Sequence, residues 1–235
     1  MTTSGLHSAA ATSVGRVRAG NEDAYGSTDH AWVVADGLGG HAGGEVASQL
    51  AVQAALRVLA QPGDDPVAAL QAAYQAASDA IGASAAEQPA LADMATTMVA
   101  ATWSATSGLH VANVGDSRAY LLSGGRFSQV TRDDNVAEEL FARGALTAEQ
   151  ARTHPGQYHL TRALGLGDWA PTVHHVPAPD GRLLLCSDGL NSEVPDDVIG
   201  GLLGTGSPQQ ACDQLVEAAL AAGGSDNITV VVVDL

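Results

Sequence analysis

The order of the expected secondary-structure elements predicts an α+β fold with antiparallel sheets. One apolar strand comes first, and two helices, a block of four strands, and then helices mixed with further strands follow it. This order lacks the strict β-α-β-α alternation that a parallel sheet requires. The chain has 235 residues, no internal repeat and no linker, so we expect a single domain over residues 1–235.

The N-terminal elements follow from a short apolar run and two helical periodicities. Residues 31–35 predict a buried strand that meets a turn at Asp36. A glycine-rich stretch over 37–44 leads into a helix over about 45–59, where apolar residues recur every four positions. A second helix is expected from Pro66 to about residue 84, because proline is favoured in a first helical turn.

The rest of the chain returns to strand-like patterns before it ends in helices and one last strand. Four successive strands are expected at 96–103, 109–114, 119–122 and 126–130. A helix is expected at 136–143, and residues 144–168 predict a long irregular segment of the kind that compact domains keep for function. The C-terminal part predicts strands at 172–176, 182–187 and 228–233 and helices at 195–203 and 208–222.

The charge balance excludes several classes of protein. The chain has 26 acidic residues against ten basic ones, which gives a net charge of −16, and all ten cations are arginines. Without lysine it cannot be a P-loop NTPase, a protein kinase or a Schiff-base enzyme. So acidic a chain lacks the basic surface of a nucleic-acid binder. Most of the acidity is ordinary surface charge, which favours solubility.

Neither targeting nor cross-linking is indicated. The N-terminus shows no signal-peptide pattern, and no segment has the length of a membrane span. Cys186 and Cys212 lack metal-ligand spacing and lie in apolar surroundings, which predicts buried free thiols. We expect a monomeric cytoplasmic protein without membrane or nucleic-acid partners.

Four aspartates share a position that surface acids seldom have. Each lies at the end of an expected apolar strand or at the turn beside one: Asp36, Asp116, Asp188 and Asp226. Asp-Gly pairs are common in turns, but four strand-end carboxylates without partners are costly. Clustered carboxylates suit Mg²⁺ or Mn²⁺, and two such ions bridged by water can generate a nucleophilic hydroxide.

The N-terminal segment offers a possible counterpart to these aspartates. Arg18 precedes two adjacent acids, Glu22 and Asp23. An arginine can bind phosphate through two parallel hydrogen bonds, while the acids could hold water on a metal ion. Alone the segment is a weak signal, since such mixtures usually mark a solvated loop.

Taken together, the motifs resemble the metal-dependent (type 2C) protein serine/threonine phosphatases, in particular the compact bacterial members. The matching segments occur in the family's order and cover nearly the whole chain, at 18–23, 36–45, 95–97, 111–121, 160–165, 186–190 and 226–229. The resemblance implies a four-layer α-β-β-α sandwich, in which two central antiparallel sheets are flanked by helices. It also implies two Mn²⁺ or Mg²⁺ ions at one edge of the sandwich, with a possible third.

The resemblance also assigns roles to individual residues. It implies that Asp36 bridges the two ions and that the Gly37 carbonyl joins it, while Asp188 and Asp226 hold the second ion. Asp116, with Asp188, matches a weaker third site.

On the same basis Arg18 binds the substrate phosphate, and Glu22 and Asp23 order the metal shell. His41 either protonates the leaving oxygen or only braces the glycine-rich loop. Residues from about 134 to 164 correspond to the family's flap, the segment that borders the active site. Asp134-Asn135 departs from the Asp-His pair common in bacterial members.

The implied activity is hydrolysis of phosphoserine and phosphothreonine in proteins by a metal-activated hydroxide, reversing a Ser/Thr kinase pathway. One alternative is a catalytically silent relative that binds phosphoproteins, although the expected ligands are intact. The other is a dinucleotide-binding domain, since residues 37–42 fit a loose Gly-x-Gly-x-x-Ala pattern. Asp36 would repel a pyrophosphate there, and no acidic residue ends a second strand about 20 residues on.

Overall fold

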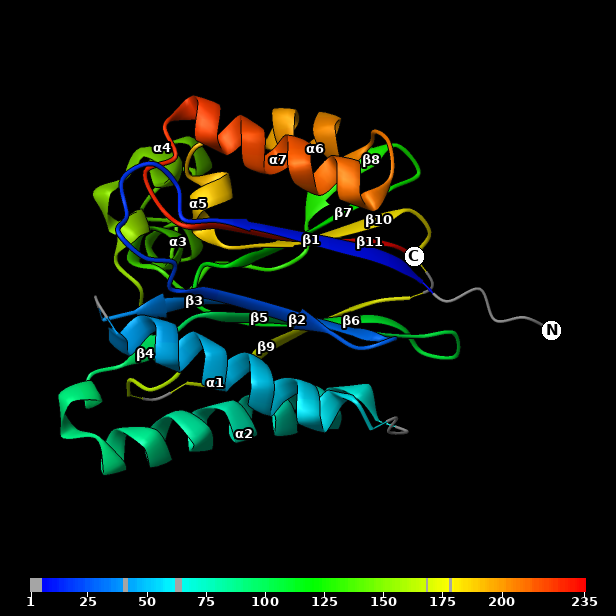
Figure 1. Cartoon of the computed structure of the whole chain (residues 1–235). Helices are drawn as coiled ribbons and strands as arrows, with labels where there is room; N and C mark the ends of the chain where they lie inside the picture. The colour runs from blue at the N-terminus through cyan, green and yellow to red at the C-terminus, as the bar shows by residue number, and fades with distance from the viewer. Residues whose placement is uncertain (1–5, 40–41, 62–64, 168, 178) are drawn as a thin grey trace.

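Two antiparallel sheets are stacked face to face in the computed structural model, which describes residues 6–39, 42–61, 65–167, 169–177 and 179–235 (Figure 1). The first sheet has the order β1 (His7–Ser13), β11 (Ile228–Asp234), β10 (Arg182–Cys186), β7 (Arg118–Ser123) and β8 (Arg126–Gln129). The second has the order β2 (Asp23–Ser27), β3 (Ala31–Leu38), β5 (Met98–Ser104), β6 (Gly108–Val114) and β9 (Thr172–Val176), and β4 (Ala95–Thr96) also pairs with β3.

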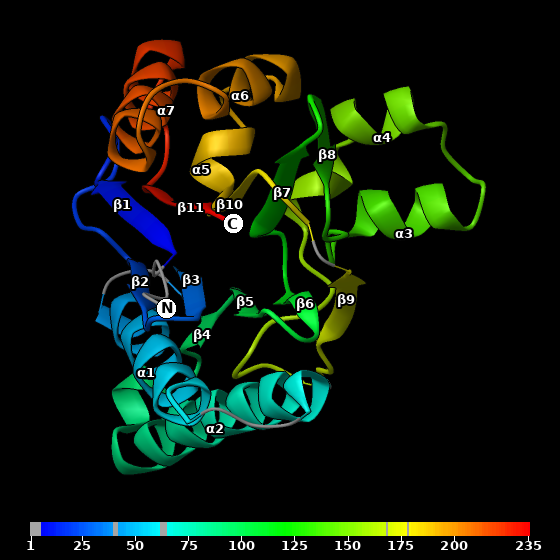
Figure 2. The ribbon, with the colours of Figure 1, turned by 90° about the vertical axis from the view of Figure 1, so that its right-hand side faces the viewer.

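Helices cover the outer face of each sheet. The second sheet is covered by α1 (Ala42–Leu59) and α2 (Pro66–Glu87), and the first by α5 (Asp188–Asn191), α6 (Asp196–Leu203) and α7 (Pro208–Ala222). Outside these layers lie α3 (Val136–Ala142) and α4 (Ala148–Thr153) (Figure 2). Two 3₁₀ helices, η1 (Pro89–Leu91) and η2 (Pro155–Tyr158), complete the elements. The arrangement confirms the predicted four-layer sandwich.

Alternation along the central strands divides the core into three apolar layers. On β11, Val230 and Val232 pack toward α7, whereas Val231 and Val233 pack between the sheets. A strand buried on both faces reads as a continuous apolar run, because successive side chains point to opposite sides. The inter-sheet layer fixes how the strand ends of one sheet lie relative to those of the other.

One buried tyrosine connects the outer helical layer to the second sheet. The α2 helix begins at the N-cap Asp65, whose carboxylate accepts the backbone N–H groups of Val67 and Ala68. Further along this helix, the buried Tyr74 hydroxyl donates to the carbonyl oxygens of Met98 (2.9 Å) and Ala112 (2.7 Å). These two residues belong to β5 and β6, so the helix is bonded to the sheet as well as packed on it.

Several elements were not predicted from the sequence. The strands β1 and β2 and the helix α5 were not expected, and α4 and η2 lie in residues 144–168, where an irregular segment was predicted. The expected strand at 96–103 is divided into β4 and β5 by Thr97. Cys186 and Cys212 are buried free thiols, as predicted.

The strand pairing also bears on the dinucleotide-binding alternative. Every strand pairing within the two sheets of the described residues is antiparallel. The alternative requires a parallel β-α-β unit, so the fold does not support it. Across the described ranges, none of the helices combines the length and apolar character needed to cross a bilayer.

We predict that Tyr74→Phe lowers the free energy of unfolding by about 1–2 kcal/mol, because the buried carbonyls lose a shared donor. Urea unfolding followed by circular dichroism measures the change. Tyr25→Phe is the matched control, since Tyr25 is an exposed tyrosine. Equal stability of the two variants would contradict the bonding role given to Tyr74.

Candidate metal centre

Asp36 lies near the end of β3, and hydrogen bonds hold its backbone. Its N–H donates to the Thr97 hydroxyl at 3.1 Å, while its carbonyl oxygen accepts the Thr97 N–H at 2.9 Å and the Thr96 hydroxyl at 2.8 Å. The β2–β3 register places Asp23 directly opposite Asp36. The chain therefore brings two predicted site residues together by strand pairing alone.

Gly37 is required here by close packing of three chain segments. Its N–H donates to the Glu22 carbonyl oxygen at 3.1 Å. A Cβ atom at this position would lie 2.6 Å from that oxygen and would clash with the Gly44 carbonyl group. Any larger residue would push the Glu22 segment away from Asp36.

Asp188 lies at the start of α5, and Ser187, the residue between β10 and α5, links the two sheets. The Ser187 hydroxyl donates to Asp23 Oδ2 at 2.7 Å and accepts the Thr229 N–H at 3.0 Å. The Ser187 N–H donates to the Thr229 carbonyl oxygen at 3.0 Å. The Asp23 carboxylate is thereby held by Ser187, the residue that precedes Asp188.

Asn227 holds the N-terminal loop against the start of β11. Its side-chain oxygen accepts the Glu22 N–H at 2.8 Å, and its amide group donates to the carbonyl oxygens of Val14 and Gly20, both at 2.9 Å. The Asn227 N–H donates to Asp226 Oδ1 at 2.8 Å. An Asn side chain has both donors and an acceptor, so one residue satisfies three backbone groups of this loop.

Arg18 projects from that loop and reaches the cluster through Asp226. Arg18 Nη2 lies 2.6 Å from Asp226 Oδ2, and about half of the Arg18 side chain is exposed. Partial burial works against the cation, but the Asp226 contact and the charges of Asp36 and Glu22 raise the pKa of Arg18. A permanent cation with free N–H donors therefore lies at the edge of the cluster.

Asp116 is positioned by a turn that requires glycine and by the start of the flap. Gly115 has φ +98°, and a Cβ atom there would lie 2.7 Å from the Thr97 side chain. The Gly115 N–H donates to Asp134 Oδ2 at 3.0 Å, and its carbonyl oxygen accepts the Asp134 N–H at 3.0 Å. Arg162, from the end of the flap, pairs with the other oxygen of Asp134.

These residues line one cavity of about 300 Å³, which we call the carboxylate cavity. The predicted site residues in its lining are Arg18, Glu22, Asp36, Gly37, Asp116, Asp188 and Asp226. Asp23 lies behind this lining, and the flap contributes Tyr158 and Leu160 to it. His41 lies outside the described residues, and its role stays a prediction.

The carboxylates raise one another's pKa. Burial first, and then the charges of Asp23, Asp188 and Asp116, raise the pKa of Asp36 well above its ordinary value. Burial also raises the pKa of Asp116 and Asp188, each with a neighbouring carboxylate as the next cause, and it raises that of Asp23 to about 6. Bound cations would offset the repulsion among these carboxylates and favour their charged forms.

The donor set fits hard divalent cations. Asp188 Oδ1 and Asp23 Oδ1 are buried and have no hydrogen-bond partner among the described residues, and such atoms are ordinarily satisfied in folded proteins. The available donors are oxygens, which Mg²⁺ and Mn²⁺ prefer. With the side chains in these positions, no three acidic, histidine or cysteine residues of the described ranges are arranged to hold one metal ion. The cavity brings the expected oxygen donors together, and holding an ion would need their side chains to turn.

A family model described as protein phosphatase 2C matches residues 12–218. The chain belongs to the protein phosphatase 2C family. It is 42% identical over 233 residues to the serine/threonine protein phosphatase PstP of Mycobacterium tuberculosis. That alignment covers 98% of the chain but 45% of the relative, so the chain spans about half the length of this protein. The serine/threonine phosphatase stp of Listeria welshimeri is 36% identical over 246 residues, with 97% of the chain and 96% of the relative covered.

Solved structures of this family share the fold. The crystal structure of Mycobacterium tuberculosis PstP/Ppp superposes with a TM-score of 0.93 at 40% identity and covers 98% of both chains. A structure of the PstP catalytic domain in complex with two manganese ions has a TM-score of 0.89 at 39% identity and covers 97% of both chains. The fold expected from the motifs is thus confirmed.

The residues that hold the site in place could not be predicted from the sequence. Asn227 and Ser187 lie inside the family-matching segments 226–229 and 186–190, yet nothing in their spacing indicates which distant groups they bind. Asn135 caps α3, because its side-chain oxygen accepts the Glu138 N–H at 2.9 Å. The Asn at the departure from the family's Asp-His pair therefore has a structural role at the start of the flap.

The raised pKa of Asp23 predicts a pH-dependent stability of the metal-free protein. The unfolded chain releases this proton near pH 4, at roughly the ordinary Asp value, whereas the folded protein holds it to about pH 6. The protonated Asp23 carboxyl therefore makes its full contribution to the free energy of unfolding below pH 4, and this contribution is lost as the pH rises through 6. Relative to wild type, Asp23→Asn should gain on the order of 3 kcal/mol between pH 4 and 7.

Urea unfolding of both proteins in the presence of a chelator measures this difference. Asn keeps an oxygen that can accept the Ser187 hydroxyl, so the hydrogen bond is a common feature of the two proteins. A pH-independent difference would contradict the shifted pKa.

Proposed function

We propose that this chain hydrolyses phosphoserine and phosphothreonine in proteins, using two bound Mn²⁺ or Mg²⁺ ions. The observation that carries the proposal is the carboxylate cavity, where Asp36, Asp116, Asp188 and Asp226 converge from both sheets with Arg18 at the edge. The likeness to named serine/threonine phosphatases supports the same chemistry. The unit proposed to do this is a single domain over residues 1–235, with the flap at about 134–164.

The expected ligands fall into two groups. Asp36 and the Gly37 carbonyl would hold one ion, Asp188 and Asp226 would hold the other, and Asp36 would touch both. Asp116 would join Asp188 at a weaker third position. When bound, the ions would offset the charge of the phosphate and make a water molecule more acidic.

The remaining steps belong to side chains of the protein. Arg18 would bind the phosphate oxygens through the guanidinium N–H groups that its contact with Asp226 leaves free. Glu22 and Asp23 would orient water around the cluster. His41 or a water molecule would protonate the leaving Ser or Thr oxygen.

A covalent phosphocysteine is not part of the proposal. Burial raises the pKa of both Cys186 and Cys212 to about 12, so both remain thiols at neutral pH. The Cys186 thiol faces Asn191 rather than a set of phosphate-binding N–H groups. Direct attack by water on phosphorus is therefore the route we propose.

The biological setting follows from the family and from the charge of the chain. We propose that the protein acts as a monomer in a bacterial cytoplasm and removes phosphate groups placed by a Ser/Thr kinase. The net charge of −16 argues against nucleic acid as a partner.

Hydrolysis of p-nitrophenyl phosphate and of a phosphothreonine peptide tests the activity. We expect turnover with Mn²⁺, its loss with EDTA, and a fall in kcat/KM of roughly 100-fold or more for Asp188→Asn, since a cation ligand is lost. Asp213→Asn, an exposed acid on α7, is the matched control and should behave as wild type.

Two results would contradict this account. Full activity in EDTA or in Asp188→Asn would separate turnover from the carboxylate cavity. Phosphopeptide binding without any turnover would instead favour a silent phosphoprotein-binding relative.

A further inference from the structure

A second and larger hollow of about 810 Å³ borders the carboxylate cavity, and we call it the flap groove. One wall comes from α3, α4 and η2 of the flap, and the opposite wall from α5 and the start of α6. Asp116, Tyr158 and Asp188 line both hollows. A chain that placed its phosphate among the carboxylates could therefore continue directly into the flap groove.

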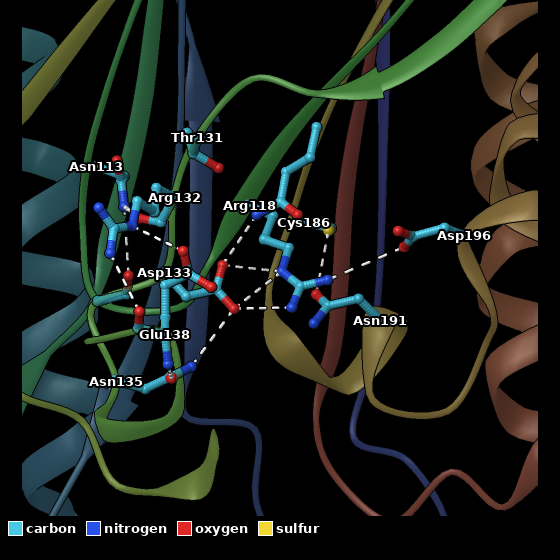
Figure 3. Close-up of polar contacts among 12 residues, drawn as sticks. Asn113, Arg118, Thr131, Arg132, Asp133, Asn135, Glu138, Cys186, Asn191 and Asp196 are labelled. Atoms are coloured by element: carbon cyan, nitrogen blue, oxygen red, sulfur yellow. Dashed lines mark hydrogen bonds and ion pairs between the residues drawn. The ribbon is translucent and has the colours of Figure 1, made fainter. Parts of the chain in front are cut away.

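Two arginines of the flap groove are already neutralised by carboxylates of the groove itself. Arg118 donates to both oxygens of Asp133, with Nε to Oδ1 at 2.9 Å and Nη2 to Oδ2 at 2.7 Å (Figure 3). It also donates to the Tyr120 hydroxyl at 2.8 Å. Arg132 is paired with Glu138 at 2.7 Å. Neither arginine adds free positive charge to the groove.

The charge that remains on the wall formed by α6 is negative. Asp196 accepts the Tyr120 hydroxyl at 3.1 Å and lies 4.0 Å from Arg118, so it is partly compensated. Asp197 is exposed and makes no side-chain hydrogen bond or ion pair with any other described residue. Acids in a first helical turn stabilise the helix by themselves; here one of them also faces an open groove beside the carboxylate cavity.

The flap wall carries exposed aromatic surface and a single cation. Phe141 is 40% exposed and Tyr158 is 67% exposed, and both line the groove. Arg152 on α4 is exposed too, and it makes no ion pair within the described ranges. Exposed aromatic rings in an open hollow of this volume suit a polypeptide better than a small ion.

We propose that the flap groove binds the polypeptide on one side of the phosphorylated residue, and that Asp197, assisted by Asp196, selects substrates with arginine or lysine there. The proposal rests on the phosphatase activity proposed above. A basic side chain on the α6 wall would pair with a carboxylate that has no partner in the described chain. An acidic one would be repelled by both aspartates.

The test compares phosphothreonine peptides that carry two arginines, two alanines or two glutamates, on the N-terminal or on the C-terminal side of the phosphothreonine. For wild type we expect kcat/KM to favour arginine over glutamate by roughly five- to ten-fold on one side only. Asp197→Lys should lower this ratio roughly five-fold, and Asp197→Asn should lower it less. Fluorescence anisotropy with the same peptides gives a readout that does not depend on turnover.

Two controls separate local recognition from other effects. Asp213→Lys makes the same change of net charge on an exposed residue of α7, which does not line the groove, and should leave the ratio unchanged. Hydrolysis of p-nitrophenyl phosphate, which has no polypeptide, should be the same in all these variants. Thermal unfolding confirms that each variant is folded, and Asp197→Asn serves if the charge reversal unfolds the protein.

Each other outcome overturns a defined part of the account. If wild type shows no charge preference on either side, or if Asp197→Lys and Asp213→Lys lower the ratio equally, the groove does not select basic substrates. If wild type fails to hydrolyse p-nitrophenyl phosphate with Mn²⁺, the proposed phosphatase activity fails first, and the groove proposal falls with it.

Discussion

Electrostatic repulsion among carboxylates is the constraint on which the site depends. Burial and the negative charges of Asp23, Asp188 and Asp116 together raise the pKa of Asp36, and Asp116 and Asp188 are affected in the same way. Left to themselves, such groups would turn toward solvent or take up protons. They stay together because each belongs to a segment that is fixed by hydrogen bonds of its own. Burying them costs stability, which is the usual price of a prepared binding site.

The carboxylate cavity is built from residues of both sheets. Asp36 lies near the end of β3 and Asp116 follows β6, both in the second sheet, whereas Asp188 and Asp226 lie beside strands of the first. The apolar layer between the sheets sets their separation. Hydrogen bonds then hold individual segments in position: Ser187 binds Asp23, and Asn227 binds the N-terminal loop.

Patterns that are local in the chain could be predicted, whereas contacts between distant segments could not. The apolar runs before Asp36 and Asp188 revealed both strands and the carboxylates at their ends. The strands β1 and β2 were missed because their small and polar residues are only partly buried and lack clear alternation. Asn227 and the Arg118–Asp133 pair each join residues that are separated in sequence, so only the fold reveals their partners. The helix α4 was missed in a polar stretch, although Thr147 and Gln150 form a capping box there.

Titration of the metal-free protein with Mn²⁺, followed by calorimetry at neutral pH, tests the central claim most directly. If the carboxylates form a two-cation site, wild type should bind two ions per chain, and Asp36→Asn, which removes the proposed bridging ligand, should lose at least one of them. Asp213→Asn should bind as wild type does. The absence of binding in wild type, or the same number of ions bound by Asp36→Asn with unchanged affinity, would contradict the account.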